Sequence, residues 1–485
     1  MPSPQFLDRF ATWVADRPDT PAIRWREATI TYRDLDALAN AAARELVSAG
    51  LRGDDRVGVS AGKSPELVAL LIALWRAGHT VMLPSHDLGS AALRMLAKAA
   101  GVTRLVTPSP VLSETTEPVG VHHVPSAGDS LLILTTSGST GVPKLVPLSP
   151  KGVDNFMCWA AGTFDIRPGA QVLSCAPLNF DLSLLDVWTT LASGATTTLV
   201  DPRFATDGSY LAHTLDTEKI TMVQAVPMVY RLLADLSIGP IRFPSVRHLV
   251  LTGDATPPKL LPELVRMFPR ARRYNVYGCT ETNDSTMYEI IDTTERKLPI
   301  GSPLPGVHTQ VISCDGDVVE GSGSGELWVS TPFQANGYLD PIATRERFVR
   351  DPADGNTVFY RTGDVVYRDD DGVFTLEGRT DFHVKVRGAR TNMAEVEHVI
   401  QRHPDVREVA VVAVPDELAG NVLHAVVCRR EGSSLNSLKL REVCREGLAR
   451  TAIPTTITIV EEALPKTSTG KVDRKAVLSR YTERI

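Results

Sequence analysis

The feature of this sequence that most restricts its fold is the alternation of short β-rich runs with longer amphipathic stretches. Runs such as "DRVGVSA", "TTTLV", "MVQAV" and "RHLVLTG" are separated by stretches such as "SPELVALLIALWRAG". Strands that alternate with helices pair largely in parallel, because each helix carries the chain back across the sheet. We therefore expect an α/β fold with mixed, largely parallel sheets flanked by helices over the larger part of the chain.

The pattern changes after about residue 378, where the elements become shorter. A helix near 393–402, strands in "EVAVVAVP" and "LHAVVC", a helix near 434–448 and the strand "TITIV" follow one another. This order is typical of a small α+β domain of roughly a hundred residues. A large domain followed by a small one also fits the length of 485 residues.

Composition argues against several classes of partner. The 51 Lys and Arg against 57 Asp and Glu give no reason to expect nucleic acid or an anionic membrane. The apolar run that contains "VALLIALW" is far shorter than a membrane span. The amino terminus lacks the pattern of a signal peptide, and the six scattered cysteines show no metal-ligand spacing. We expect a cytoplasmic protein.

One loop carries a chemical signal in its own residues. The stretch "TTSGSTGVPK" at 135–144 follows the apolar run "LLIL" and combines glycines, hydroxyl side chains and a lysine. Glycines let backbone N–H groups approach an anion, and the hydroxyls and the lysine add donors and positive charge. It is not a Walker A motif, because Lys144 does not follow the second glycine. From these residues alone, a phosphate-binding loop and a polar turn after a strand both stay open.

Four further segments follow this loop along the chain. They are "RYNVYGCTETND" at 273–284, "YRTGD" at 360–364, "GRTDFHVKVRGAR" at 378–390 and "LPKTSTGKVDRK" at 464–475. In this order, the segments resemble the adenylate-forming superfamily of acyl-CoA synthetases, luciferases and nonribosomal peptide synthetase adenylation domains. The resemblance extends from "TITYRDL" near residue 30 to "GKVDRK" near 475. It is closest to stand-alone amino-acid-adenylating enzymes and D-alanine–carrier-protein ligases.

The resemblance implies a two-step reaction. A carboxylate attacks the α-phosphate of ATP to give an acyl-adenylate and pyrophosphate, and the phosphopantetheine thiol of a carrier protein then displaces AMP. It also implies a core over residues 1–380 that binds ATP and substrate, and a mobile lid over residues 381–485. Asp381 of "GRTD" would be the hinge between them. Since ten residues follow Lys475, we expect the carrier to be a separate protein.

The resemblance also assigns residues to the nucleotide. It favours the phosphate-binding interpretation of the glycine-rich loop, which would hold the β- and γ-phosphates of ATP. The residues expected at the nucleotide are Thr136, Ser137, Gly138, Ser139, Thr140, Gly141 and Lys144 at the phosphates, Asn275 and Tyr277 at the adenine, Asp364 at the ribose, and Arg379 at the ribose and phosphate region.

Three residues would act at the reacting phosphate. Lys471 of "STGKVDR" would bridge the substrate carboxylate and the developing pentavalent phosphate. Thr280 would reach the α-phosphate, and Glu281 would ligate Mg²⁺ through a hard carboxylate oxygen. The implied cofactors are ATP and Mg²⁺.

Substrate choice centres on Asp181 in "APLNFDLSLLDVW". Amino-acid-activating relatives keep an Asp at this position to pair with the substrate ammonium; the alternative is that Asp181 only caps the following helix. A second carboxylate, Asp284, suggests a polar or cationic side chain or an amino group displaced from the α-position, but it also fits a solvated loop acid. The pocket walls implied by the resemblance are Leu182, Leu185, Gln224, Val250, Thr252, Val276, Asp284 and Ser285.

Departures from the usual motifs leave the catalytic groups in place. Cys279, for example, stands where proline is common in the family motif. Two other functions remain open at this point. One is an acyl- or aryl-acid CoA ligase that uses free CoA as the thiol, and the other is a catalytically silent nucleotide-binding protein.

Overall fold

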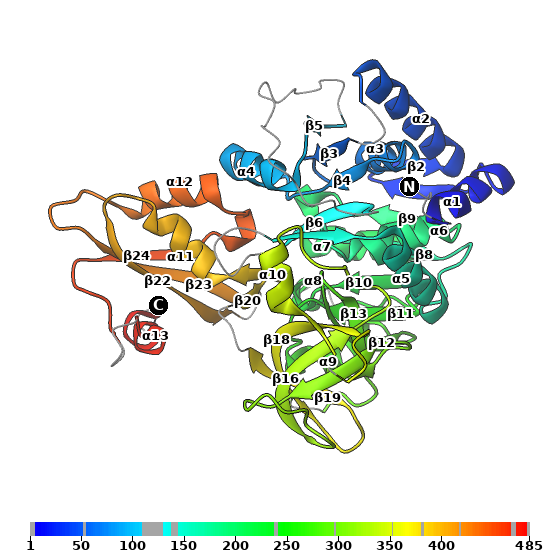
Figure 1. Cartoon of the computed structure of the whole chain (residues 1–485). Coiled ribbons are helices and arrows are strands. Elements are labelled where there is room, and N and C mark those ends of the chain that lie inside the picture. Colours follow the sequence, from blue (N-terminus) through cyan, green and yellow to red (C-terminus); the bar gives the residue numbers. More distant parts are fainter. Residues whose placement is uncertain are drawn as a thin grey trace. The chain divides into compact units, whose positions relative to one another are not determined.

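The computed structural model describes residues 5–51, 55–108, 130–136, 144–236, 241–294, 297–351, 353–379, 383–416, 419–466 and 472–482. Contacts within the chain divide it into two compact units (Figure 1). The first, here called the core unit, comprises Met1–Pro84, Ala97–Leu134 and Leu145–Thr380. The second, the C-terminal unit, comprises Ser85–Leu96, Thr135–Lys144 and Asp381–Ile485.

The largest sheet of the core unit, here called the main sheet, has the strand order β14-β13-β12-β11-β10-β8-β9-β1-β2 within the described residues. Its middle strands pair in parallel, and antiparallel pairs lie towards both edges. The expected mixed, largely parallel sheet is therefore confirmed. The strands are β1 (Pro21–Trp25), β2 (Ala28–Thr31), β8 (Gln171–Ser174), β9 (Thr196–Leu199), β10 (Met222–Ala225), β11 (His248–Thr252), β12 (Arg272–Cys279), β13 (Asn283–Glu289) and β14 (Ser302–Pro303).

Two further sheets accompany the main sheet. One has the order β5-β3-β4-β6-β7, and the other has the order β15-β16-β18-β17 with β19 paired to β18. The first comprises β3 (Arg56–Val59), β4 (Thr80–Met82), β5 (Arg104–Val106), β6 (Leu132–Thr136) and β7 (Lys144–Leu148). The second comprises β15 (His308–Ile312), β16 (Gly323–Ser330), β17 (Phe348–Arg350), β18 (Val358–Arg368) and β19 (Phe374–Arg379).

Helices connect and cover these strands (Figure 1). They are α1 (Gln5–Asp16), α2 (Tyr32–Ser48), α3 (Pro65–Arg76), α4 (Ser90–Ala100), α5 (Pro150–Thr163), α6 (Thr190–Ala192), α7 (Gly208–Thr217), α8 (Pro227–Ala234), α9 (Leu261–Met267) and α10 (Pro341–Arg347), with a π-helix, η1 (Leu184–Thr189), and the short 3₁₀ turns Pro202–Phe204 and Pro258–Leu260. In the part of the chain that the structure describes, no helix is both long and apolar enough to cross a bilayer.

The start of α2 shows how local sequence fixes these elements. The Thr31 side chain accepts a hydrogen bond from the Asp34 backbone N–H at 3.1 Å, and the Asp34 carboxylate accepts one from the Thr31 N–H at 3.0 Å. This reciprocal capping box satisfies backbone donors that a helix start leaves unpaired. The strand β2 therefore leads directly into a capped helix.

The main sheet separates two apolar cores. Val223, Leu249 and Leu251 belong to one core, whereas Val250 and Val276 belong to the other. Alternating residues of a strand point to opposite faces, so the two sets cover opposite faces of the sheet. The sheet face that carries Val250 and Val276 packs against η1, because Leu184 and Leu185 of η1 lie in the same core.

The C-terminal unit is a small α+β fold, as expected. β22 (Val406–Asp416) pairs antiparallel with β23 (Gly420–Arg429), which pairs in parallel with β24 (Thr456–Val460). Apolar side chains such as Val396, Val411 and Leu440 form its core. The remaining elements are β20 (His383–Val386), β21 (Ala389–Asn392), α11 (Met393–Gln401), α12 (Ser437–Gly447), the 3₁₀ turn Arg450–Ala452 and α13 (Arg474–Thr482).

Candidate functional site

The hairpin of β12 and β13 carries the segment "RYNVYGCTETND" and sends alternate side chains of β12 to opposite faces. Asn275 and Tyr277 share one face. The Asn275 amide donates to the carbonyl of Pro299 at 2.6 Å, and the Tyr277 hydroxyl donates to Asp364 Oδ2 at 2.5 Å. Val276, on the other face, packs in the core that contains η1. The residues expected at the adenine and those expected at the substrate thus leave the same strand in opposite directions.

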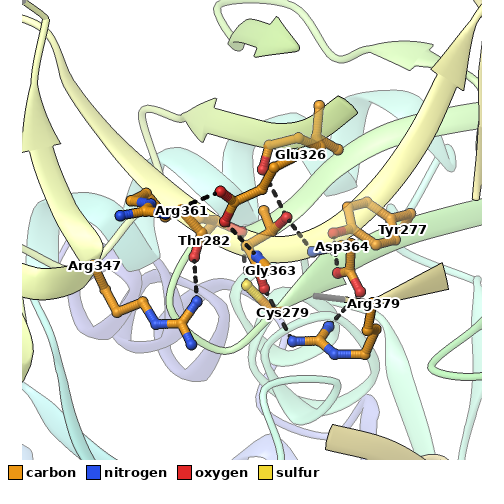
Figure 2. A network of polar contacts seen from close by, with 11 residues as sticks. Tyr277, Cys279, Thr282, Glu326, Arg347, Arg361, Gly363, Asp364 and Arg379 are labelled. Carbon is orange, nitrogen blue, oxygen red and sulfur yellow. Dashed lines mark hydrogen bonds and ion pairs between the residues drawn. The ribbon is translucent and has the colours of Figure 1, made fainter. Parts of the chain in front are cut away.

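Asp364 is the centre of a polar network in the core unit (Figure 2). It lies on β18 directly opposite Arg379 of β19, whose guanidinium pairs with Asp364 Oδ1 and also donates to the Thr362 carbonyl at 3.1 Å. Burial, together with the adjacent Asp364 carboxylate, holds the pKa of the Tyr277 phenol well above its ordinary value. The phenol therefore remains a donor, and both oxygens of Asp364 are held in place.

A second set of contacts fixes the turn before Asp364. Glu326 of β16 accepts from the Gly363 backbone N–H at 3.1 Å and pairs with the Arg361 guanidinium at 3.2 Å (Figure 2). The Arg347 guanidinium donates to the Arg361 carbonyl at 3.3 Å. Gly363 has a φ of 73°, a left-handed conformation that favours glycine. Sequence reasoning did not single out Glu326 or Arg347, because their local sequence carries no motif.

Glu281 is a buried residue of the turn between β12 and β13. Its side chain is 1% exposed and accepts from the Tyr338 hydroxyl at 2.7 Å, and Tyr338 in turn contacts the Tyr360 hydroxyl at 3.1 Å. Burial, followed by the negative charge of Glu281, raises the pKa of Tyr338 well above its ordinary value. Tyr338 was not foreseen; Tyr360 begins the segment "YRTGD", although no role was assigned to it.

Asp181 lies in the same electrostatic environment as this turn. Burial raises the pKa of its carboxyl, a hydrogen bond from Thr280 lowers it, and the charge of Glu281 raises it further. Ser183, rather than Asp181, directly precedes η1, and it makes no side-chain cap. The backbone carbonyl of Asp181, however, accepts from the Leu184 N–H at 2.9 Å, so Asp181 belongs to the turn that leads into η1 and its role as a helix cap stays open.

Most expected pocket residues share one face of the main sheet. Gln224 pairs with Val250 across β10 and β11, and Thr252 pairs with Val276 across β11 and β12. Paired residues of neighbouring strands point to the same face, as do residues two apart along one strand. These four side chains therefore face η1.

Gln224 connects this face to the segment after Asp181. Its amide donates to the Leu182 carbonyl at 3.0 Å, and Leu185 is fully buried in the core beside η1. Ser285 is also fully buried, and its hydroxyl contacts the Thr282 hydroxyl at 3.0 Å within the hairpin turn. The chain thus brings Asp181, Leu182 and Leu185 to the sheet face that carries Gln224.

A β-bulge determines where Asp284 lies. Tyr277 pairs with Thr286, but the next residue, Gly278, pairs with Asp284, so Ser285 is an extra residue in β13. Asp284 therefore faces the same side as Gly278, two residues beyond Val276. Burial, and then the charge of Asp181, raises the pKa of Asp284 to about 8.

Several expected residues lie outside the described ranges. They are Ser137, Gly138, Ser139, Thr140 and Gly141 of the glycine-rich loop, the proposed hinge Asp381 and the proposed catalytic Lys471. The two flanking residues of the loop are described. Thr136 ends β6, and Lys144 begins β7, the next strand of the same sheet.

A buried lysine that sequence reasoning missed supports η1 and β8. Lys63 is 5% exposed, and its ammonium donates to the carbonyls of Ser174 and Ala176, both at 2.7 Å. Asp186 of η1 is fully buried, and its charge favours the charged form of Lys63, while burial lowers the Lys63 pKa and raises that of Asp186. Lys63 thus holds the carboxyl end of β8 beside the helix that follows Asp181.

Replacing Lys63 tests this supporting role. We expect Lys63→Met to lower the free energy of unfolding by about 1–3 kcal/mol, because the buried carbonyls lose their donor. Uptake of a proton by Asp186 would limit the loss, since its pKa is already raised. Urea unfolding measures the change, and Lys151→Met, at an exposed position of α5, is the control. Equal stability of the two variants would contradict the role.

Comparisons with known proteins found similar sequences. A family model described as AMP-binding enzyme matches residues 10–124 and 113–339, and one described as AMP-binding enzyme C-terminal domain matches residues 395–471. Phenyloxazoline synthase MbtB of Mycobacterium tuberculosis is 30% identical over 98% of this chain, which spans only 35% of that protein's length. A D-alanine--D-alanyl carrier protein ligase of Bacillus cereus is 27% identical over 99% of this chain and 100% of its own length.

The fold also matches solved structures. The artificially fused adenylation–PCP di-domain protein NpsA-ThdA from Klebsiella oxytoca superposes with a TM-score of 0.79 at 27% sequence identity. The match covers 93% of this chain and 93% of that one.

Proposed function

Because this chain belongs to the AMP-binding enzyme family and is an adenylate-forming enzyme, we propose that it activates an amino acid and transfers it to a carrier protein. An oxygen of the substrate carboxylate attacks the α-phosphate of ATP, the bond to pyrophosphate breaks, and an aminoacyl-adenylate forms. The phosphopantetheine thiol then attacks the adenylate carbonyl, gives up its proton and releases AMP, which leaves a thioester. The mention of a carrier protein in the name of the Bacillus cereus relative supports this acceptor.

The observation that carries the amino-acid part is the environment of Asp181. Its carboxyl has a raised pKa because of burial, and the nearby charge of Glu281 raises it further. A carboxylate in such surroundings is stabilised by a cation, because burying an unpaired charge costs free energy. The ammonium group of an amino acid supplies that cation, whereas a fatty or aryl acid does not.

The network around Asp364 supports the proposed ribose site. Tyr277 and Arg379 each occupy one of its carboxylate oxygens. A carboxylate oxygen has two lone pairs, so each oxygen can still accept a hydrogen bond from a ribose hydroxyl. Asp364 and Arg379 therefore remain the candidates for binding the ribose. Asn275 and Tyr277 remain the candidates for binding the adenine.

Glu281 is the residue that would hold Mg²⁺. No group of three His, Cys, Asp or Glu side chains in the described residues is arranged to bind a metal alone. Mg²⁺ is usually bound by one or two carboxylates together with phosphates and water, so a single buried glutamate fits that ion. When bound beside ATP, the metal would neutralise phosphate charge.

The remaining roles complete the proposal. Lys471 would stabilise the charge that develops on the phosphate in the first step, and Thr280 would bind the α-phosphate. The loop from Thr136 to Lys144 would bind the β- and γ-phosphates. Residues 381–485 would act as a lid that moves about Asp381 between the two steps.

An ATP–pyrophosphate exchange screen tests the proposal. We expect one or a few amino acids to support exchange well above background, and their des-amino analogues to support much less. The product is then formed with a phosphopantetheinylated carrier protein or with free CoA, and the carrier should give the thioester faster. Exchange with simple carboxylic acids only, followed by transfer to CoA, would establish an acyl- or aryl-acid CoA ligase instead. Absence of any exchange would favour a catalytically silent nucleotide-binding protein.

A further inference from the structure

Asp284 is a second carboxylate at the proposed substrate site, and its position is built into the hairpin. Asn283 adopts a left-handed φ of 58°, and Gly278 opposite leaves no room for a side chain, since a Cβ there would lie 2.2 Å from the Asn283 carbonyl oxygen. These features hold the bulge that turns Asp284 towards the face of Val276. If β12 and β13 paired regularly beyond Tyr277, without the bulge, Asp284 would pair with Cys279 and point to the opposite face.

Asp284 does not behave as a solvated loop acid. Its side chain is only partly exposed, and within the described residues its carboxylate makes no hydrogen bond or ion pair. Its neighbours on the same sheet face are Val276, Thr252 and Gln224, which carry no charge. Partly buried carboxylates usually have a hydrogen-bonding or charged partner. A bound ligand can provide this missing partner for Asp284.

In the described part of the chain, the charged groups that influence Asp284 and its neighbour Asp181 are acidic. Asp181, from the segment before η1, is close enough to influence Asp284 electrostatically, and Glu281 of the hairpin turn influences Asp181 in the same way. The pKa of Asp284 is raised to about 8, so its carboxyl is protonated at neutral pH in the free protein. The proton removes the repulsion between the carboxylates of Asp284 and Asp181. A single ammonium group at Asp181 would leave Asp284 without a cationic partner.

We infer that the substrate carries a second ammonium group, bound by Asp284, and that the enzyme activates a diamino carboxylic acid. This inference rests on the proposed function, in which Asp181 binds the first ammonium. Because Asp181 and Asp284 influence one another electrostatically, a single substrate molecule with two ammonium groups can pair with both carboxylates. Gln224, Val250, Thr252 and Val276 then surround the carbon chain on the sheet face that they share.

Paired substrates that differ only in the terminal amino group test the inference. ATP–pyrophosphate exchange is measured with 2,4-diaminobutyrate against 2-aminobutyrate, ornithine against norvaline, and lysine against norleucine. A hydrogen bond between charged groups is expected to lower the KM of the best diamino acid by about 10- to 100-fold relative to its partner. Asp284→Asn should abolish the difference in KM between the two substrates of a pair. Asp292→Asn, which changes an exposed acid shortly after β13, should retain it.

The pH dependence adds a readout that a structural role would not change. Asp284 must lose its proton to pair with an ammonium group, so binding releases a proton below pH about 8. As the pH rises from 6 to 8, the KM for the diamino acid should therefore fall by up to about tenfold per pH unit. Asp181 also has a raised pKa and must be ionised to bind the first ammonium group. The dependence should therefore be weaker, though not absent, in Asp284→Asn and with the monoamino partner of the native enzyme.

Each alternative result has a distinct meaning. If monoamino acids serve as well as diamino acids and Asp284→Asn changes nothing, the inference is overturned while amino-acid activation stands. The native enzyme could instead prefer a β-amino acid with one ammonium group and lose that preference in Asp284→Asn. Both carboxylates would then bind the same ammonium group, and the inference of a second ammonium group would be wrong. Exchange with des-amino carboxylic acids alone would refute the proposed function itself. Retained exchange with monoamino acids shows that Asp284→Asn is folded.

Discussion

Lys471→Ala is expected to reduce adenylate formation by two orders of magnitude or more. The proposed role of Lys471 is to stabilise negative charge that is present mainly in the transition state, and loss of such a contact usually lowers kcat by about 10²–10³. Thiolation of a pre-formed adenylate should decrease much less, because the proposed lid movement takes the lysine away from the phosphate. Single-turnover measurements of the two half-reactions separate these effects.

A neighbouring lysine provides the control. Lys466 lies in the same segment and pairs with Glu408 at 2.8 Å at the surface. Exposed ion pairs contribute about 0–1 kcal/mol, so Lys466→Ala should leave both half-reactions close to those of the native enzyme. If Lys471→Ala slowed both half-reactions equally, its proposed role in the first step would be wrong.

Asp181→Ala is expected to weaken use of the amino acid by roughly two to three orders of magnitude. Removal of one partner from a buried ion pair leaves the other charge unpaired, which costs about 3–5 kcal/mol when the site is well buried. The kcat/KM for the amino acid in pyrophosphate exchange reports this loss directly. The KM for ATP should stay nearly unchanged, because no nucleotide contact is proposed for Asp181.

The des-amino analogue should show the opposite behaviour. It should be a poor substrate of the native enzyme and a relatively better one of Asp181→Ala, since the variant no longer buries a carboxylate without a cation. If the native enzyme used a simple carboxylic acid as well as any amino acid, and Asp181→Ala made no difference, the acyl- or aryl-acid ligase would replace the present proposal.

Several elements were predictable because short-range chemistry fixes them. The capping box of Thr31 and Asp34 marks the start of α2, and β-rich runs separated by helices predict the parallel strands of the main sheet. The segments "RYNVYGCTETND" and "YRTGD" indicated Tyr277 and Asp364, although their resemblance to a family, rather than any local rule, paired them with a nucleotide. The hydrogen bond between these two residues joins positions 87 residues apart.

The residues that hold the site in place could not be predicted in the same way. Lys63, Glu326 and Tyr338 belong to no motif, and each acts through a partner distant in the chain: Ser174, Gly363 and Glu281. Their local sequences would fit exposed polar residues equally well. Only the packing that buries them reveals that they are partners of the site.

The sequence by itself therefore determined the class of fold, the family and the identity of the chemical groups, because periodicity, caps and motifs are local properties of the chain. The tertiary structure decided which of those groups meet and what charge they carry. The bulge at Ser285 decides that Asp284 faces the sheet side of Val276, and burial near Asp181 then raises its pKa. Side-chain direction in a strand reverses with a shift of one residue, and a pKa depends on surroundings assembled from distant segments. Neither quantity is encoded by the residues adjacent to Asp284 alone.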